Sequence, residues 1–273
     1  MFSAHWLLAL VAATSLASGQ APDATPSAAE LTRLYVQHAD AEPDETQNYT
    51  FLIHAHHVTY VLGRQTNDNT EDSEQIFIGG QPYVRRLALN EKPLHGNDLK
   101  QENDLYDKAV KDRAGLTEVD RLKAGKLPTV GITFLPRNHF VSDFRQEILG
   151  HELVDGHDCI ILNLTPLYPD GPQELQLHIR LSLEAKTLEL VQYCVQVLGQ
   201  VGSFGKGSAF ERRDICLENV WLPVFSKIDA IVGPPSGSRN PHHVDTEDFT
   251  NYRRFTVSST IHQVPPNESQ PPQ

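Results

Sequence analysis

The chain has 273 residues and carries 23 Lys and Arg against 35 Asp and Glu, which gives a formal net charge of −12. This acidic balance argues against nucleic acid as a partner, because non-specific affinity for phosphates comes from clustered Lys and Arg. Three Cys are too few for a disulfide-dense scaffold. Hydrophobic residues make up 39% of the chain, enough to bury a core. The composition predicts an acidic globular protein.

The first residues have the pattern of a secretory signal peptide. A short apolar run, Trp6–Ala13, is followed by the small residues Ala17–Gly19. The run is too short to span a bilayer, which takes about 20 apolar residues. We therefore expect a signal peptide over residues 1–19, a spacer over 20–26 and no transmembrane anchor. A disordered start or a membrane anchor is the alternative.

The rest of the chain is predicted to be one domain with a loose tail. Residues 263–273 are rich in Pro and nearly free of apolar side chains, so they cannot offset the entropy of ordering. We expect them to be disordered, and residues 27–262 to form a single folded domain.

Two or three helices are expected before the middle of the chain. Ser27-Ala-Ala-Glu30 is a capping box. A second helix is predicted over Leu99–Ala114 with Asp98 as its N-cap, and a third short helix over residues 118–123. The apolar stripe of the first helix, spaced i, i+3, i+4 and i+7, consists of Leu31, Leu34, Tyr35 and His38.

Alternation of apolar and polar side chains predicts a long run of strands. Between Leu177 and Glu184 every second residue is apolar, which places one face in a core and the other in water. A turn at Ala185-Lys186 leads into a similar segment over residues 188–198. We count roughly ten strands with short connections, which is typical of an antiparallel meander. The others are expected near residues 49–60, 76–78, 83–89, 159–165, 221–228 and 255–261.

These elements predict an α+β fold. It consists of a curved antiparallel sheet, a half-barrel of roughly ten strands, with two or three helices packed on its concave face. So few helices cannot cover both faces of such a sheet. It should therefore curl around a helix or close as a barrel, to remove its edges and shield its apolar face. A sheet curled in this way tends to leave an apolar cavity.

Histidine is the one enrichment that raises the question of a metal. Period two places His54 and His56 on one face of a strand and His57 on the other. A second pair, His242 and His243, follows a loop rich in Pro, Gly and Ser. Two facing His and an Asp from elsewhere make a three-ligand metal site, and solvated polar residues are the alternative interpretation. Because no acid–base or nucleophile–base set accompanies these His, we expect no catalytic residue and no cofactor.

The three Cys are Cys159, Cys194 and Cys216. The strand register predicted from the turns keeps them apart by more than the roughly 7 Å that a disulfide allows between Cα atoms. We therefore expect free thiols.

Several short segments together resemble one family. The chain is similar to bacterial periplasmic proteins with the outer-membrane lipoprotein-carrier (LolA-like) fold, a curved half-barrel closed by helices over an apolar concave face. The segments that carry the resemblance are Asn48-Tyr-Thr-Phe, Pro82-Tyr-Val-Arg-Arg-Leu87, Phe144-Arg, Gly150-His-Glu-Leu-Val-Asp-Gly156, Ile179–Val191, Phe204-Gly-Lys-Gly-Ser-Ala-Phe210, Trp221-Leu-Pro223 and Asn251-Tyr-Arg-Arg-Phe255.

The resemblance implies a non-catalytic periplasmic carrier of lipid-like, acyl-bearing ligands, including lipidated proteins. A sensory or protein-interaction module of the cell envelope is the alternative, and a His-based metal-dependent hydrolase ranks below both. A carrier would place its ligand on the apolar faces of the strands. The candidate ligand-binding residues are Phe51, Ile53, Ile179, Leu181, Val191, Tyr193, Val224, Ile228, Phe255 and Val257.

Overall fold

The computed structural model describes residues 26–41, 48–79, 81–114, 137–168, 170–172, 175–233 and 240–254. The predicted signal peptide, the tail, the short helix over 118–123 and the strand over 255–261 lie outside these ranges. The elements are α1 (Ala28–Ala41), β1 (Tyr49–Val61), β2 (Arg64–Ile78), β3 (Gln81–Leu89), β4 (Lys92–Pro93), α2 (Gly96–Arg113), α4 (His139–Ser142), β5 (Phe144–Val154), β6 (His157–Pro166), β7 (Leu177–Glu184), β8 (Leu190–Val197), β9 (Ala209–Leu217), β10 (Val220–Ile231) and β11 (His242–Arg254).

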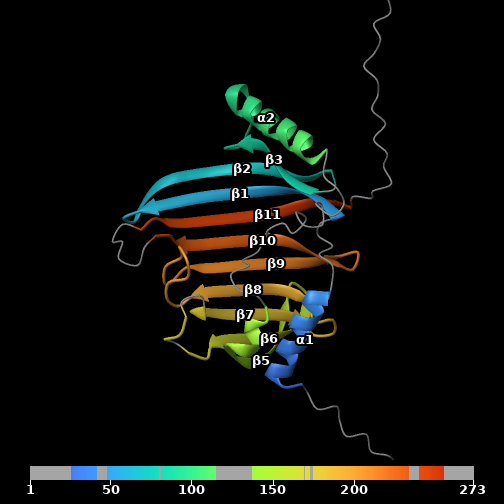
Figure 1. Cartoon of the computed structure of the whole chain (residues 1–273), viewed down its shortest axis with the longest axis vertical. Coiled ribbons are helices and arrows are strands. Elements are labelled where there is room, and N and C mark those ends of the chain that lie inside the picture. The colour runs from blue at the N-terminus through green and yellow to red at the C-terminus, as the bar shows by residue number, and fades with distance from the viewer. Residues whose placement is uncertain are drawn as a thin grey trace, which may run out of the picture.

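All the described strands form one antiparallel sheet (Figure 1). It has eleven strands in the order β4-β3-β2-β1-β11-β10-β9-β8-β7-β6-β5, so β4 and β5 are its edges and the sheet is not closed. The predicted α+β fold with a curved antiparallel sheet is confirmed. The first long strand pairs with the last, which joins the amino-terminal hairpins to the rest of the sheet.

Helix α1 covers one face of the sheet, which we call the inner face; the opposite face is the outer face. The backbone N–H of Glu30 donates to the Ser27 side-chain oxygen at 3.2 Å, as the capping box predicts. The buried stripe is rotated slightly from the predicted one and consists of Leu31, Thr32, Tyr35 and Val36. The three apolar side chains among them pack on apolar residues of β5 to β9 and form the largest core cluster with them.

Helix α2 lies along β3 at the edge of the sheet (Figure 1). The Tyr106 ring meets the Tyr83 ring edge to face at 5.9 Å, and Arg113 donates to the Pro82 carbonyl oxygen at 3.0 Å. Because β4 has only two residues, most of the outer edge of β3 has no strand partner, and the helix shields it. The predicted N-cap, Asp98, is wrong: the helix begins at Gly96 and Asp98 lies in its first turn.

No helix in the described ranges is long and apolar enough to cross a membrane.

Four long strands differ from the predicted ranges. β2 runs over fifteen residues, although only its last few were expected to be extended. The predicted ranges leave out β5 and β9, although the register that separates the Cys already places Cys216 on a strand. β11 begins at His242, a residue that was placed with a loop. β2, β9 and β11 are each paired on both sides over part of their length, so neighbouring backbone compensates for their polar composition.

Burial predicts how two leucines of the sheet differ in their effect on stability. Leu177 is 1% exposed in the core cluster, whereas Leu153, near the end of an edge strand, is 77% exposed. We expect Leu177→Ala to lower the free energy of unfolding by about 2–5 kcal/mol, because it leaves a cavity. Leu153→Ala, the control, should change it by less than about 0.5 kcal/mol. Urea unfolding monitored by circular dichroism measures both, and equal losses would contradict this location of the core.

Candidate ligand-binding face

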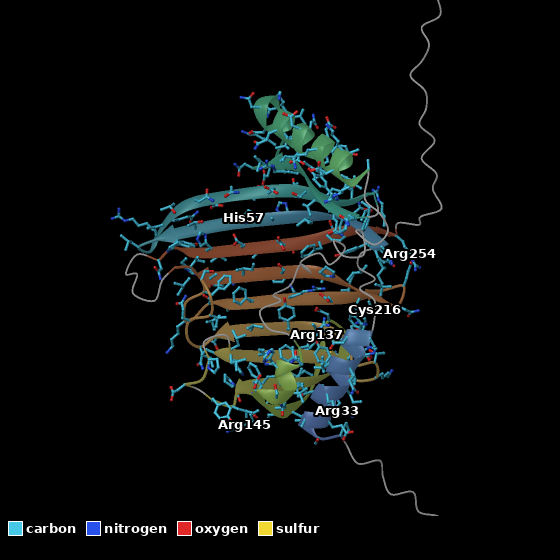
Figure 2. All side chains as sticks on the ribbon, in the orientation of Figure 1. Arg33, His57, Arg137, Arg145, Cys216 and Arg254 are labelled. Carbon is cyan, nitrogen blue, oxygen red and sulfur yellow. The ribbon has the colours of Figure 1, made fainter. Side chains whose placement is uncertain are left out.

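The inner face divides into an apolar half and a polar half. Registered residues of neighbouring strands share a face, so the pairing can be followed across the sheet. One such row consists of Leu164, Ile179, Val195, Phe210, Ile228, Asp245, His57 and Asn69. The first five belong to or pack on the cluster under α1, and the last three are polar. Figure 2 shows His57 on β1, away from α1, and Arg137 next to that helix.

The change from apolar to polar comes earlier, at β9, in the next row of the sheet. In the neighbouring row, Leu162, Leu181 and Tyr193 lead to Arg212. The guanidinium of Arg212 donates two hydrogen bonds to the Asp214 carboxylate, at 2.6 and 2.8 Å. Only 8% of Arg212 and 5% of Asp214 are exposed. This pair is therefore a buried ion pair at the boundary between the two halves.

Burial changes the acid–base behaviour of this boundary. Desolvation raises the pKa of Asp214, and the charge and hydrogen bonds of Arg212 oppose that rise. Tyr35 of α1 interacts electrostatically with both residues, and its own burial raises its pKa. Burial also raises the pKa of Tyr252. Tyr252 of β11 also interacts electrostatically with both residues, so the ion pair lies between Tyr35 of α1 and Tyr252 of β11.

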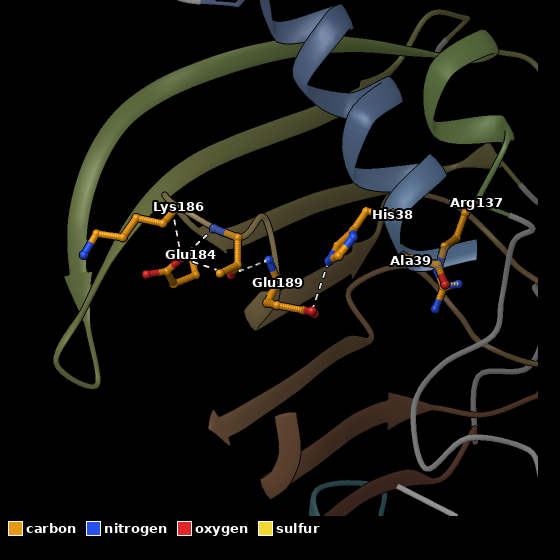
Figure 3. A network of polar contacts seen from close by, with 7 residues as sticks. His38, Ala39, Arg137, Glu184, Lys186 and Glu189 are labelled. Carbon is orange, nitrogen blue, oxygen red and sulfur yellow. Dashed lines mark hydrogen bonds and ion pairs between the residues drawn. The ribbon is translucent and has the colours of Figure 1, made fainter. Parts of the chain in front are cut away.

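Polar contacts hold the carboxyl-terminal end of α1 (Figure 3). His38 Nε2 lies 3.0 Å from a carboxylate oxygen of Glu189, and both side chains are half-buried. Arg137 donates to the Ala39 carbonyl oxygen at 2.9 Å and pairs with Asp40 at 3.1 Å. A cation at a helix carboxyl terminus is favourable because unpaired carbonyl groups are concentrated there.

The turn between β7 and β8 presents Glu189 to the helix. One carboxylate oxygen of Glu184 accepts hydrogen bonds from the backbone N–H groups of Lys186 and Thr187, both at 2.8 Å. These bonds hold the turn, so Glu189 reaches α1 from a fixed position (Figure 3).

Four of the predicted ligand-binding residues lie together under α1. They contribute to a single cluster on the apolar half of the inner face, where the helix covers them. They are Ile179, Leu181, Tyr193 and Ile228.

Phe51 and Ile53 lie in a second cluster on β1, β10 and β11. The Phe51 ring is 5.8 Å from the Phe249 ring and 5.2 Å from the Tyr252 ring. Asn251 adopts a positive φ of 58° where the β1–β11 register shifts, and this irregularity precedes Tyr252. The hydroxyl of Tyr252 donates to the Pro223 carbonyl oxygen.

The remaining candidates are scattered. Val191 belongs to a third cluster with Cys159 and Ile161. Val224 is half-buried where the β9–β10 register shifts. Phe255 and Val257 lie outside the described residues. The predicted set is therefore not one continuous lining in the described part of the chain.

The predicted facing of the strand histidines is confirmed. His54 and His56 lie on the outer face, paired with Asp72 at 2.6 Å and Asp68 at 2.8 Å, and the bonds from His56 and Gln65 lower the pKa of Asp68. His57 lies on the inner face. Within the described ranges, no three His, Cys, Asp or Glu side chains come together to hold a metal ion.

The second pair of histidines behaves in the same way. His242 Nε2 lies 2.6 Å from an Asp229 carboxylate oxygen, and His243 Nδ1 lies 3.2 Å from the Thr59 hydroxyl. The pattern of separate partners fits the interpretation as solvated polar residues. His242 also borders a shallow depression of about 430 Å³ at the β1–β2 turn, which none of the ten predicted ligand-binding residues lines.

All three Cys are free thiols, as predicted. Cys159 is fully buried, and desolvation raises its pKa to about 11. Cys194 is registered with Arg180 on β7 and so has no Cys opposite it on that strand.

The sequence analysis missed the buried ion pair. The spacing of Phe210, Arg212 and Asp214 indicated the pair. In a strand, side chains two residues apart lie on the same face, so Arg212 and Asp214 share a face with the apolar Phe210. Because the predicted ranges include no strand over these residues, this alternation was not followed.

The fold and this face define an α+β protein with an open, curved antiparallel sheet and one helix over part of its inner face. No protein-family model matches the chain, and no curated protein matches it. Solved structures do resemble it.

A DUF1329 family protein from Desulfovibrio piger is 13% identical with a TM-score of 0.34, over 84% of this chain and 93% of that one. An outer membrane lipoprotein-sorting protein domain from Vibrio parahaemolyticus is 9% identical with a TM-score of 0.35, over 85% and 93%. A LolA superfamily protein from Nitrosomonas europaea is 12% identical with a TM-score of 0.29, over 82% and 93%. The structural neighbours thus include the superfamily that the sequence resembles. At TM-scores below 0.5 these likenesses do not bear on function.

The buried ion pair predicts a non-additive effect on stability. Arg212→Met or Asp214→Leu alone leaves one buried charge unpaired and should cost about 3–5 kcal/mol of unfolding free energy. The double variant removes both charges and should recover most of that loss, or exceed the wild type by about 1–4 kcal/mol. Urea unfolding of the four proteins of this cycle gives the coupling, and additive losses would contradict a coupled pair.

Proposed function

We propose that this protein is a non-catalytic carrier of a lipid-like, acyl-bearing ligand. The acyl chain binds between α1 and the apolar half of the inner face, over β5 to β9. The observation that carries the proposal is that this half is a continuous apolar surface covered by one amphipathic helix. Acyl chains require a water-shielded apolar surface of this kind.

The free energies of helix and ligand burial are of similar size. α1 buries three large apolar side chains, Leu31, Tyr35 and Val36, at about 1.5–3 kcal/mol each. Each methylene of an acyl chain contributes about 0.8 kcal/mol when buried, so about ten methylenes provide about 8 kcal/mol. A long acyl chain therefore compensates for moving α1 off the sheet.

The attachment of α1 and the polarity of the sheet fit this exchange. The polar contacts of the helix with the rest of the protein include the His38–Glu189 contact and the bonds from Arg137 to Ala39 and Asp40, which are exposed or half-buried and so individually weak. Beyond the apolar half, Arg212 and the polar side chains after it provide surroundings for a ligand's head group.

A periplasmic location and a role in lipoprotein sorting are the finer form of the proposal. The resemblance in the sequence and the signal-peptide pattern of the first residues support them. The ligand would then be a lipid or a lipidated protein.

A protein-interaction module of the cell envelope is the second candidate. Large apolar side chains are exposed on β3 and α2, at the rim of the sheet, which is the feature expected of a contact surface. They are Val84, Leu87, Leu99, Leu105 and Val110.

A photoreactive fatty acid with a diazirine near the end of its chain tests the site. We expect labelling of α1 and of inner-face residues such as Leu162, Leu181 and Val195, mapped by peptide mass spectrometry. Excess unlabelled fatty acid should abolish this labelling. Labels confined to the outer face, for example at Arg180, or to α2 would overturn the proposed site.

The contact between His38 and Glu189 provides a kinetic test of the same proposal. We expect His38→Ala to accelerate uptake of a fluorescent fatty acid about two- to five-fold, because a single hydrogen bond such as that between His38 and Glu189 contributes about 1 kcal/mol. The matched control is His178→Ala, which removes a histidine hydrogen-bonded to Asn163 on the outer face. Stopped-flow fluorescence measures both rates, and equal rates for the two variants would count against release of α1.

A further inference from the structure

A second depression, of about 360 Å³, lies between α2 and β3, far from α1 (Figure 1). Its walls are largely apolar and come from Tyr83 and Val84 on the strand and from Leu105 and Ala109 on the helix. None of the residues of the proposed acyl site lines it. The depression is thus a separate feature of the edge of the sheet.

A buried carboxylate lines this depression. Glu102 of α2 is only 4% exposed and accepts a hydrogen bond from the Tyr83 hydroxyl at 3.1 Å. It forms no ion pair with any residue in the described ranges. Glutamate is almost never this deeply buried unless it is paired, because desolvating an unpaired carboxylate is costly. Within the described residues, the Glu102 carboxyl group thus accepts one hydrogen bond and takes part in no ion pair.

The neighbouring cations have other partners. Lys108 pairs with Asp112 at 3.0 Å, one helical turn along the surface. Arg113 donates to the carbonyl oxygens of Gln81 and Pro82, and its guanidinium lies 5.6 Å from the centre of the Tyr83 ring. These cations are held at the rim and at the carboxyl-terminal end of the helix rather than on the Glu102 carboxylate.

We propose that this depression binds an alkylammonium group, a primary ammonium on a short apolar stem. The ammonium donates to the free lone pairs of Glu102, and the stem lies between Val84 on one side and Leu105 and Ala109 on the other. A charged hydrogen bond in a partly desolvated site is stronger than one between neutral groups, which favours the ammonium over an uncharged analogue. The source of this group is a free amine or a lysine side chain of a protein partner.

Amide chemical-shift titration of the ¹⁵N-labelled full chain tests the site. The probes are n-pentylammonium, n-pentanol of the same stem length, and the peptide acetyl-Ala-Lys-Ala-amide. We expect saturable shifts confined to residues 83–84 and 102–109 with a cationic probe, and at least about tenfold weaker binding of pentanol. Tighter binding of the peptide identifies a lysine side chain as the source, and tighter binding of pentylammonium identifies a free amine. Equal affinity for pentanol, or no saturable shift with either cation, would overturn the proposal.

Variants separate the charge from the shape of the site. Glu102→Gln keeps the size of the side chain and should weaken cation binding at least about tenfold. Its thermal midpoint should change little, because the Gln carbonyl oxygen can still accept the hydrogen bond from the Tyr83 hydroxyl. Asp112→Asn, the control, should leave binding unchanged, and Ala109→Leu should block the depression while Glu102 remains. Undiminished binding by Glu102→Gln or by Ala109→Leu would contradict the site.

Discussion

A single antiparallel sheet has no second sheet to bury its apolar face, and the rest of this structure depends on how that face is covered. α1 provides the cover for β5 to β9, where buried side chains of the strands meet its apolar stripe. A helix is a narrow cover for a sheet of eleven strands, so it cannot protect the whole face. The strands beyond β9 carry instead a more polar inner surface and a smaller aromatic cluster.

The buried Arg212–Asp214 pair marks where one half of the inner face gives way to the other. A buried ion pair contributes little net stability, because the desolvation of both charges offsets their attraction. For the proposed function, the position of the pair between the apolar and the polar rows therefore matters more than its contribution to stability. An amphiphile has the same order of polarity as this face, with an apolar chain followed by a polar group. The proposed carrier function rests on that correspondence.

Local patterns in the sequence predicted those helices and strands whose signals lie within the element itself. The capping box at Ser27 and the spacing of Leu31 and Tyr35 located α1, and the alternation after Leu177 located β7, because both signals lie within the element. β2 could not be predicted in this way. Its Asn, Asp and Glu residues disfavour strands, and pairing with β1 and β3 supplies what the local sequence lacks.

Only part of the candidate ligand-binding site was predicted, namely the part whose signal is local in the sequence. Ile179, Leu181 and Tyr193 lie on adjacent strands joined by a tight turn, so their shared face followed from the turn. Phe51 and Ile53 have the same alternation, yet they lie on the far side of β9, in another cluster. Which strands share a cover depends on the pairing of β1 with β11, residues that are far apart in the chain. Alternation within one strand carries no information on that pairing.

The central claim is that an acyl chain binds between α1 and the apolar half of the inner face and moves the helix off the sheet. Hydrogen–deuterium exchange of the α1 amides, with and without a saturating long-chain fatty acid, tests this most directly. The account predicts faster exchange over residues 28–41 in the presence of the fatty acid, while the amides of β6 and β7 keep their protection. Unchanged or slower exchange of α1 with bound fatty acid would contradict it.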